Sequence, residues 1–186
     1  MKKYIFLLAI IVISSCNNSK NEELKNTVAK KELRPFFDSD KIVHYYLNFS
    51  DDDFAKILMK ENNTKMEKEF FDIYVHTFPD TIPQENFEKI LLKHNYKKSS
   101  LTIKQQKDIQ NVFSEKDSSP DSYASCAAEY RDIFIFKKKE KTIGIAKICF
   151  KCGRFQIIGS KLETNGFGLW SELDKLKSII RSNEKP

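Results

Sequence analysis

The stretch that decides the fold is residues 130–159, which read YRDIFIFKKKEKTIGIAKICFKCGRFQIIG. It contains two runs of β-branched and aromatic side chains, Tyr130–Phe136 and Thr142–Phe150, which are typical of β-strands. A lysine-rich segment separates the two runs. The pattern therefore predicts a β-hairpin that turns at Lys139 and Glu140.

Two further segments extend this predicted sheet. Gly153–Gly159 follows the hairpin closely and carries Phe and Ile side chains, so it predicts a third strand. Upstream, Lys41–Phe49 alternates apolar and polar residues with a period of two, which indicates another strand. We therefore expect an antiparallel sheet of three to four strands.

Helix signals occupy much of the remaining chain. Three Ser or Thr residues are each followed, three positions later, by an Asp, Glu or Gln that can complete a helix N-cap. The predicted helices span residues 51–60, 65–77, 84–94, 103–114 and 169–181. Pro83 falls in the first turn of helix 84–94, and Asn95 is its expected C-cap. The sequence predicts an α+β fold with about five helices packed mainly on one face of the sheet.

The composition is that of a globular protein. Of the 186 residues, 40% are hydrophobic, which is enough apolar material for a packed core and excludes wholesale disorder. The formal net charge of +6 includes Lys2 and Lys3, and their removal would leave +4. Lysines cluster around the predicted turn at Lys139, but no nucleic-acid-binding motif accompanies them. We therefore expect no nucleic acid partner.

The N-terminus has the pattern of an export signal. Lys2 and Lys3 precede an uninterrupted apolar run, Tyr4–Ile13. As a helix this run would be about 15 Å long, half of the roughly 30 Å needed to cross a bilayer core. Residues 1–15 are therefore predicted to be a signal peptide rather than a transmembrane span.

The residues that end this signal, Ile13-Ser14-Ser15-Cys16, resemble the lipobox of bacterial lipoproteins. The resemblance implies that Cys16 becomes the first residue of the mature chain and carries acyl chains. Two or three acyl chains together hold a protein firmly on a membrane. The following stretch, rich in Asn, Lys, Ser and Glu, resembles that of lipoproteins of Bacteroidota. The implied location is the cell envelope, at the outer membrane.

The mature chain then divides into two parts. Residues 16–33 carry few apolar side chains and no aromatic ones, so they are predicted to form a flexible tether behind the lipidated cysteine. Residues 34–186 are predicted to form a single α+β domain.

The remaining cysteines are Cys126, Cys149 and Cys152. A regular register through the predicted hairpin would place Cys126 opposite position 153, so the three sulfurs are expected to converge. Three interpretations stay open. The first is a structural disulfide between Cys126 and either Cys149 or Cys152, which an oxidising envelope favours and which leaves one thiol free.

The second interpretation is a thiol–disulfide site formed by Cys149 and Cys152, which have the Cys-X-X-Cys spacing of redox motifs. The third is a zinc site, because residues 149–153 resemble the knuckle of zinc ribbons. That resemblance implies Cys126 as the third ligand and a histidine as the fourth. The second Cys-X-X-Cys of a ribbon is absent from the sequence.

Other catalytic patterns are missing from the sequence. His44, His76 and His94 lack metalloprotease spacing, and residues 166–168 lack the third glycine of a dinucleotide-binding loop. The sequence thus supports no enzyme class. We expect an envelope lipoprotein, anchored through Cys16, whose domain is a non-catalytic binding or structural module with a cysteine-stapled hairpin.

The expected partners are the membrane, through the lipid anchor, and another envelope protein. No cofactor is expected. The alternative function is a thiol-redox or zinc-binding module that uses Cys126, Cys149 and Cys152.

Overall fold

The computed structural model of the chain describes residues 33–116 and 126–182. The elements, in chain order, are β1 (Lys41–Tyr46), α1 (Asp51–Leu58), α2 (Lys65–Tyr74), α3 (Phe87–Lys93), β2 (Lys97–Ser99), α4 (Ile103–Val112), β3 (Asp132–Lys138), β4 (Lys141–Cys149), β5 (Arg154–Ile158) and α5 (Trp170–Arg181). The predicted signal peptide, the lipidated Cys16 and the predicted tether up to residue 32 lie outside the described residues.

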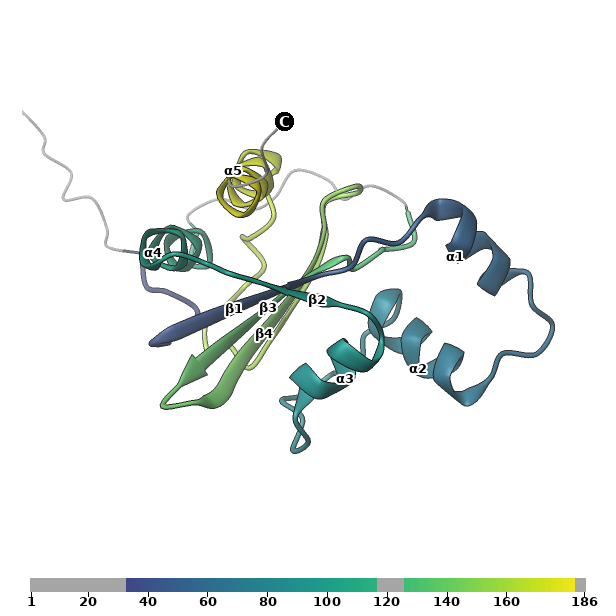
Figure 1. The fold of residues 1–186 in the computed structure, drawn as a ribbon. Coiled ribbons are helices and arrows are strands. Elements are labelled where there is room, and N and C mark those ends of the chain that lie inside the picture. The colour runs from purple at the N-terminus through teal and green to yellow at the C-terminus, as the bar shows by residue number, and fades with distance from the viewer. Residues whose placement is uncertain (1–32, 117–125, 183–186) are drawn as a thin grey trace, which may run out of the picture. The chain divides into compact units, whose positions relative to one another are not determined.

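The five strands form one sheet in the order β2-β1-β3-β4-β5, and every neighbouring pair is antiparallel (Figure 1). The α+β class is confirmed, with one strand more than the three to four predicted. The additional strand is β2, a polar three-residue segment that pairs with the edge of β1.

The central hairpin of β3 and β4 turns where the sequence predicts. Lys139 and Glu140 both have positive φ, 48° and 63°, which is the backbone of a type I′ turn. The register shifts by one residue between Phe136 and Lys137, close to this turn. Such a bulge adds one unpaired residue to β4, so positions beyond it pair one place later than a regular register predicts.

Helices cover both faces of the sheet, which differs from the prediction that they pack mainly on one face. On one face, α4 and α5 pack over Phe134 and Phe136 of β3. On the other, α2 and α3 pack over Ile133 and Ile135, and α1 joins them through partly buried side chains. Figure 1 shows these two helix groups on opposite sides of the strands. Both faces are apolar because alternate residues of β3 point in opposite directions and all four are hydrophobic.

The helix starts follow their capping residues. Thr64 and Thr102 form capping boxes at α2 and α4, and Ser50 accepts a hydrogen bond from the Asp53 amide at α1. At α3 the cap is Asn86, so the helix begins three residues after the predicted start at 84. These caps fix where each helix enters its layer.

Candidate functional site

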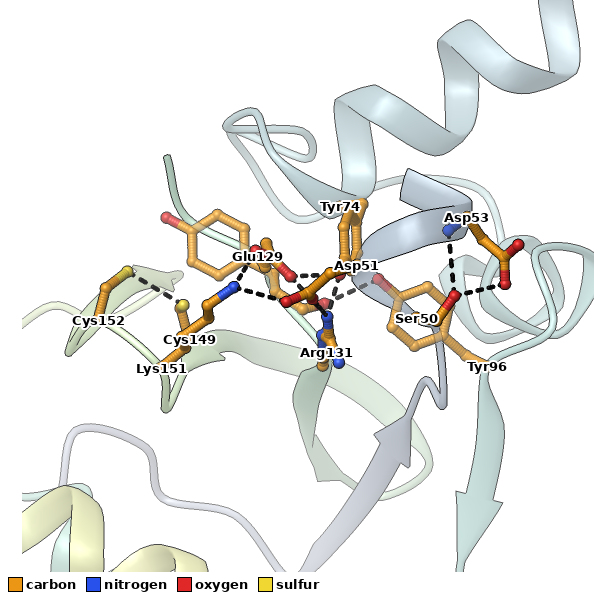
Figure 2. A network of polar contacts seen from close by, with 11 residues as sticks. Ser50, Asp51, Asp53, Tyr74, Tyr96, Glu129, Arg131, Cys149, Lys151 and Cys152 are labelled. Carbon is orange, nitrogen blue, oxygen red and sulfur yellow. Dashed lines mark hydrogen bonds and ion pairs between the residues drawn. The ribbon is translucent and has the colours of Figure 1, made fainter. Parts of the chain in front are cut away.

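The three cysteines converge at the end of the β4–β5 hairpin. Cys126 and Cys152 form a disulfide, so the predicted structural disulfide is present and its second partner is Cys152. Cys149 stays a free thiol, and its Sγ lies 3.1 Å from the Sγ of Cys152 (Figure 2). Cys149 and Cys152 are 1% and 5% exposed, whereas Cys126 is partly exposed.

The backbone holds Cys149 and Cys152 close together. Cys149 is the last residue of β4 and pairs with Arg154, the first residue of β5. Between them the chain makes a tight turn, in which the Gly153 amide donates to the Cys149 carbonyl at 2.9 Å. Gly153 has a φ of 71°, a conformation that glycine adopts without strain.

This arrangement bears on the zinc interpretation. Zinc is bound by cysteine thiolates, and two of the three sulfurs are joined to each other here. Among residues 33–116 and 126–182, no group of three His, Cys, Asp or Glu side chains is placed to hold a metal ion. A zinc site would therefore require prior reduction of the Cys126–Cys152 disulfide.

A network of charged side chains lies beside the cysteines (Figure 2). Arg131 donates to Asp51 at 2.6 Å, to Glu129 at 2.7 Å and to the Tyr74 hydroxyl at 3.0 Å. Lys151, from the turn between β4 and β5, donates to the same two carboxylates at 3.1 Å each. The network therefore ties α1 and α2 to the segment before β3 and to the cysteine turn.

Electrostatics keep both carboxylates of this network ionised. Hydrogen bonds from Lys151 and Arg131 hold the pKa of Asp51 below its usual range. Burial alone would raise the pKa of Glu129, but hydrogen bonds from Arg131, Tyr74 and Lys151 outweigh it and lower that pKa. Because each acid is paired with cations, both carboxylates stay ionised at neutral pH.

Lys147 is a completely buried lysine in the middle of β4. Its Nζ donates to the carbonyls of His76 and Phe78, at 2.6 and 2.8 Å, and lies 4.3 Å from the centre of the Tyr130 ring. Burial lowers the pKa of Lys147 to about 7. This role was not predicted from the sequence, although a single lysine within an otherwise apolar strand is a signal for a buried, partnered amine.

A cavity of about 640 Å³, called here the His44 cavity, is lined by His44, Ser99, Arg131, Asp132 and Arg181, among others. Its residues come from β1, β2, β3 and α5, with Arg131 directly before β3. The volume is within the range of small-molecule sites.

A line of hydrogen bonds crosses three neighbouring strands in this cavity. His44 Nδ1 lies 2.7 Å from the Ser99 hydroxyl, and His44 Nε2 lies 2.9 Å from Asp132 Oδ1. If Nε2 carries the ring proton, it donates to Asp132, and Nδ1 then accepts from Ser99. His44 also stacks on the Phe134 ring at 4.7 Å. The buried histidine is thus fixed in orientation, with the partly buried Ser99 at the outer end of the line.

The cavity is lined by more cations than carboxylates. Lys98, Arg131 and Arg181 line it with one carboxylate, Asp132, and Lys98 Nζ lies 4.0 Å from Glu88. A second cavity of about 250 Å³ shares Arg131, Asp132 and Arg181 with it. Within the described residues Arg181 has no ion-pair partner, whereas Arg131 is paired with Asp51 and Glu129.

The three histidines of the sequence have separate environments. His76 is exposed and lies 3.9 Å from Asp72. His94 is buried, with Nε2 3.2 Å from Glu69. Only His44 lines one of the two cavities described above.

Comparison of the chain with protein family models, with curated proteins and with solved structures finds no match. In the part of the chain that the structure describes, no helix is both long and apolar enough to cross a membrane.

Proposed function

We propose that this chain is a cell-envelope lipoprotein, anchored through acyl chains on Cys16, whose domain binds a small anionic ligand in the His44 cavity. The lipobox-like residues before Cys16 support the anchor and the envelope location. The cavity supports a binding role, because it combines a volume of about 640 Å³ with converging polar groups.

The observation that carries the binding proposal is the charge of the lining. Three cations line the cavity with one carboxylate, Asp132, which is already engaged by His44. Of these cations, Arg131 is paired with Asp51 and Glu129, and Lys98 Nζ lies 4.0 Å from Glu88. Arg181 has no ion-pair partner among the described residues, so its planar guanidinium is free to take a carboxylate or phosphate group in a bidentate manner. The ligand is accordingly a carboxylate- or phosphate-bearing component of the envelope.

The test is a titration of the isotopically labelled protein with citrate and with inorganic phosphate, followed by amide NMR shifts. We expect saturable shifts at the amides of His44, Ser99 and Arg181, and none with glycerol as an uncharged control. Arg181→Gln should weaken binding about tenfold or more, because a charge-assisted hydrogen bond is lost.

Lys175→Gln is the matched control. Lys175 also lies on α5, and it lines neither of the two cavities. If both variants weaken binding equally, or if the shifts spread over surface lysines, the ligand is held by general charge attraction and the cavity proposal fails.

A second candidate function is thiol–disulfide exchange with an envelope partner. One specific observation favours it, the 3.1 Å contact between the free Cys149 thiol and Cys152 of the disulfide. A structural disulfide needs no third sulfur in contact with it.

A further inference from the structure

Cys152 Sγ has two sulfur neighbours. It is bonded to Cys126, and it lies 3.1 Å from the Sγ of Cys149. Disulfide exchange begins when a thiolate attacks one sulfur of a disulfide directly. The sulfur that Cys149 contacts is that of Cys152, so the geometry selects which sulfur would be attacked and which would leave.

We propose that the three cysteines form a disulfide relay, in which the bond moves from Cys126–Cys152 to Cys149–Cys152. Cys149 gives up its proton and its sulfur bonds to Cys152 Sγ. The bond between Cys152 and Cys126 breaks, and Cys126 leaves as a thiolate that takes up a proton. One disulfide and one thiol exist before and after, so the step needs no oxidant or reductant. The relay deepens the second candidate function and rests on it.

The backbone around the relay favours this movement. Cys149 and Cys152 belong to the same turn, which the Gly153 amide closes onto the Cys149 carbonyl. Both sulfurs are packed by Ala128 and Tyr130 and are shielded from water. The contact is therefore built by the β4–β5 hairpin, and the Cys-X-X-Cys spacing is one that redox motifs use to form a disulfide.

The relay changes which thiol is accessible. Cys149 is 1% exposed, whereas Cys126 is partly exposed. Movement of the bond therefore converts a buried thiol into an accessible one at Cys126. That thiol can attack the disulfide of a second molecule, forming a mixed disulfide and releasing one thiol of that molecule. Such disulfides persist in the oxidising envelope.

The test maps linkages and free thiols in the same sample, using the chain with Cys16→Ser so that three cysteines remain. Trypsin cleaves after Lys147, Lys151 and Arg154, which places Cys126, Cys149 and Cys152 on three different peptides. One aliquot is quenched in acid, which stops exchange, and is then unfolded and alkylated. A second is alkylated with N-ethylmaleimide while folded at pH 8.

We expect the acid-quenched sample to be linked Cys126–Cys152, with the label on Cys149. In the folded sample, most of the label should accumulate on Cys126 while Cys149 and Cys152 become linked. Label on Cys149 alone in the folded sample would overturn the relay. A Cys126–Cys149 linkage would also overturn it, because that bond requires attack on the other sulfur.

Two variants serve as controls. Cys149→Ser should leave Cys126 unlabelled, because no thiol remains to displace it. Cys126→Ser should form the Cys149–Cys152 bond on air oxidation, and failure to do so would show that the turn cannot close this bond. Circular dichroism of both variants verifies that they are folded.

The relay and the second candidate function can fail separately. Incubation with oxidised glutathione should add one glutathione at Cys126 if the exposed thiol exchanges with outside disulfides. If the bond moves but no glutathione is added, the relay stands and exchange with a partner is refuted. If the bond does not move, the relay is refuted, whatever the citrate titration shows for the His44 cavity.

Discussion

Replacement of Lys147 by Met should change how the stability of the fold depends on pH. Lys147 is completely buried, and burial lowers its pKa from 10.5 to about 7. Between these two values the amine is neutral in the folded chain and protonated in the unfolded chain. The unfolded state therefore binds more protons, so the free energy of unfolding rises with pH in this range.

The magnitude follows from the same two pKa values. Each pH unit between them contributes at most about 1.4 kcal/mol, and partial titration near pH 7 reduces this contribution. From pH 6 to pH 9 the contribution of Lys147 is roughly 2 to 3 kcal/mol. Lys147→Met removes it, and also removes the donor of two part-buried hydrogen bonds to the carbonyls of His76 and Phe78, at a cost of about 0.5 to 1.5 kcal/mol for each bond.

The assay is urea unfolding at pH 6, 7, 8 and 9, in a Cys149→Ser background so that no disulfide exchange intervenes. The stability advantage of the parent over Lys147→Met should grow by roughly 2 to 3 kcal/mol from pH 6 to pH 9. The control variant Lys161→Met removes an exposed lysine instead, and its free energy of unfolding should change with pH as that of the parent does. If the free energies of unfolding of the parent and of Lys147→Met changed equally with pH, Lys147 would not be a neutral amine in the folded chain, and the reasoning would be refuted.

Two other substitutions give independent tests. Cys16→Ala should move the protein from the membrane to the soluble fraction and abolish any acyl mass, and a variant that still partitions with membranes would contradict the lipid anchor. Gly144→Ala should destabilise the fold by about 1 to 3 kcal/mol in urea unfolding, because a Cβ at this position would overlap the buried Phe37 ring. In the double variant Gly144→Ala with Phe37→Leu, the loss of stability should be smaller than the sum of the two single losses. Strict additivity would show that the added methyl group does not overlap the Phe37 ring.

The parts of the fold that sequence predicted well are those with a local cause. Lys139 and Glu140 sit between two strand-like runs, and a two-residue connection leaves little choice of turn. Thr64 and Thr102 marked helix starts because their side chains replace missing backbone partners. Each of these signals acts within four residues, so no knowledge of the tertiary structure was needed.

The parts that sequence missed depend on distant neighbours. β2 consists of Lys97, Lys98 and Ser99, which have no strand propensity of their own, and it is a strand because β1 offers an unpaired edge. The second helix layer was foreseeable in principle. Ile133–Phe136 is apolar at every position, a pattern of strands that are buried on both faces.

The candidate sites divide in the same way. The convergence of the cysteines was predicted by extending the hairpin register to Cys126, but β3 begins only at Asp132 and β4 ends at Cys149. Cys126 and Cys152 therefore lie beyond the paired residues, and the register could not identify the bonding partner. His44, Ser99 and Asp132 are far apart in sequence and carry no shared motif. They meet because β2, β1 and β3 are neighbours in the sheet, which only the three-dimensional structure shows.

The segment from Cys126 to Asp132 links the disulfide relay at its first residue to the His44 cavity at its last two. Movement of the disulfide would change the cavity only if the disulfide held the whole segment in place. The middle of the segment is held by other contacts. The Tyr130 amide donates to the Tyr74 carbonyl at 2.8 Å, and the Tyr96 hydroxyl donates to the Tyr130 carbonyl at 2.8 Å.

Beyond this anchor, Arg131 is fixed by its ion pairs and Asp132 by the first pairing of β3. The bond at Cys126 therefore constrains one end of the segment, and the sheet and the ion pairs constrain the other. For this reason the disulfide can move while Arg131 and Asp132 keep their places in the cavity. The citrate titration should accordingly give the same affinity with either disulfide.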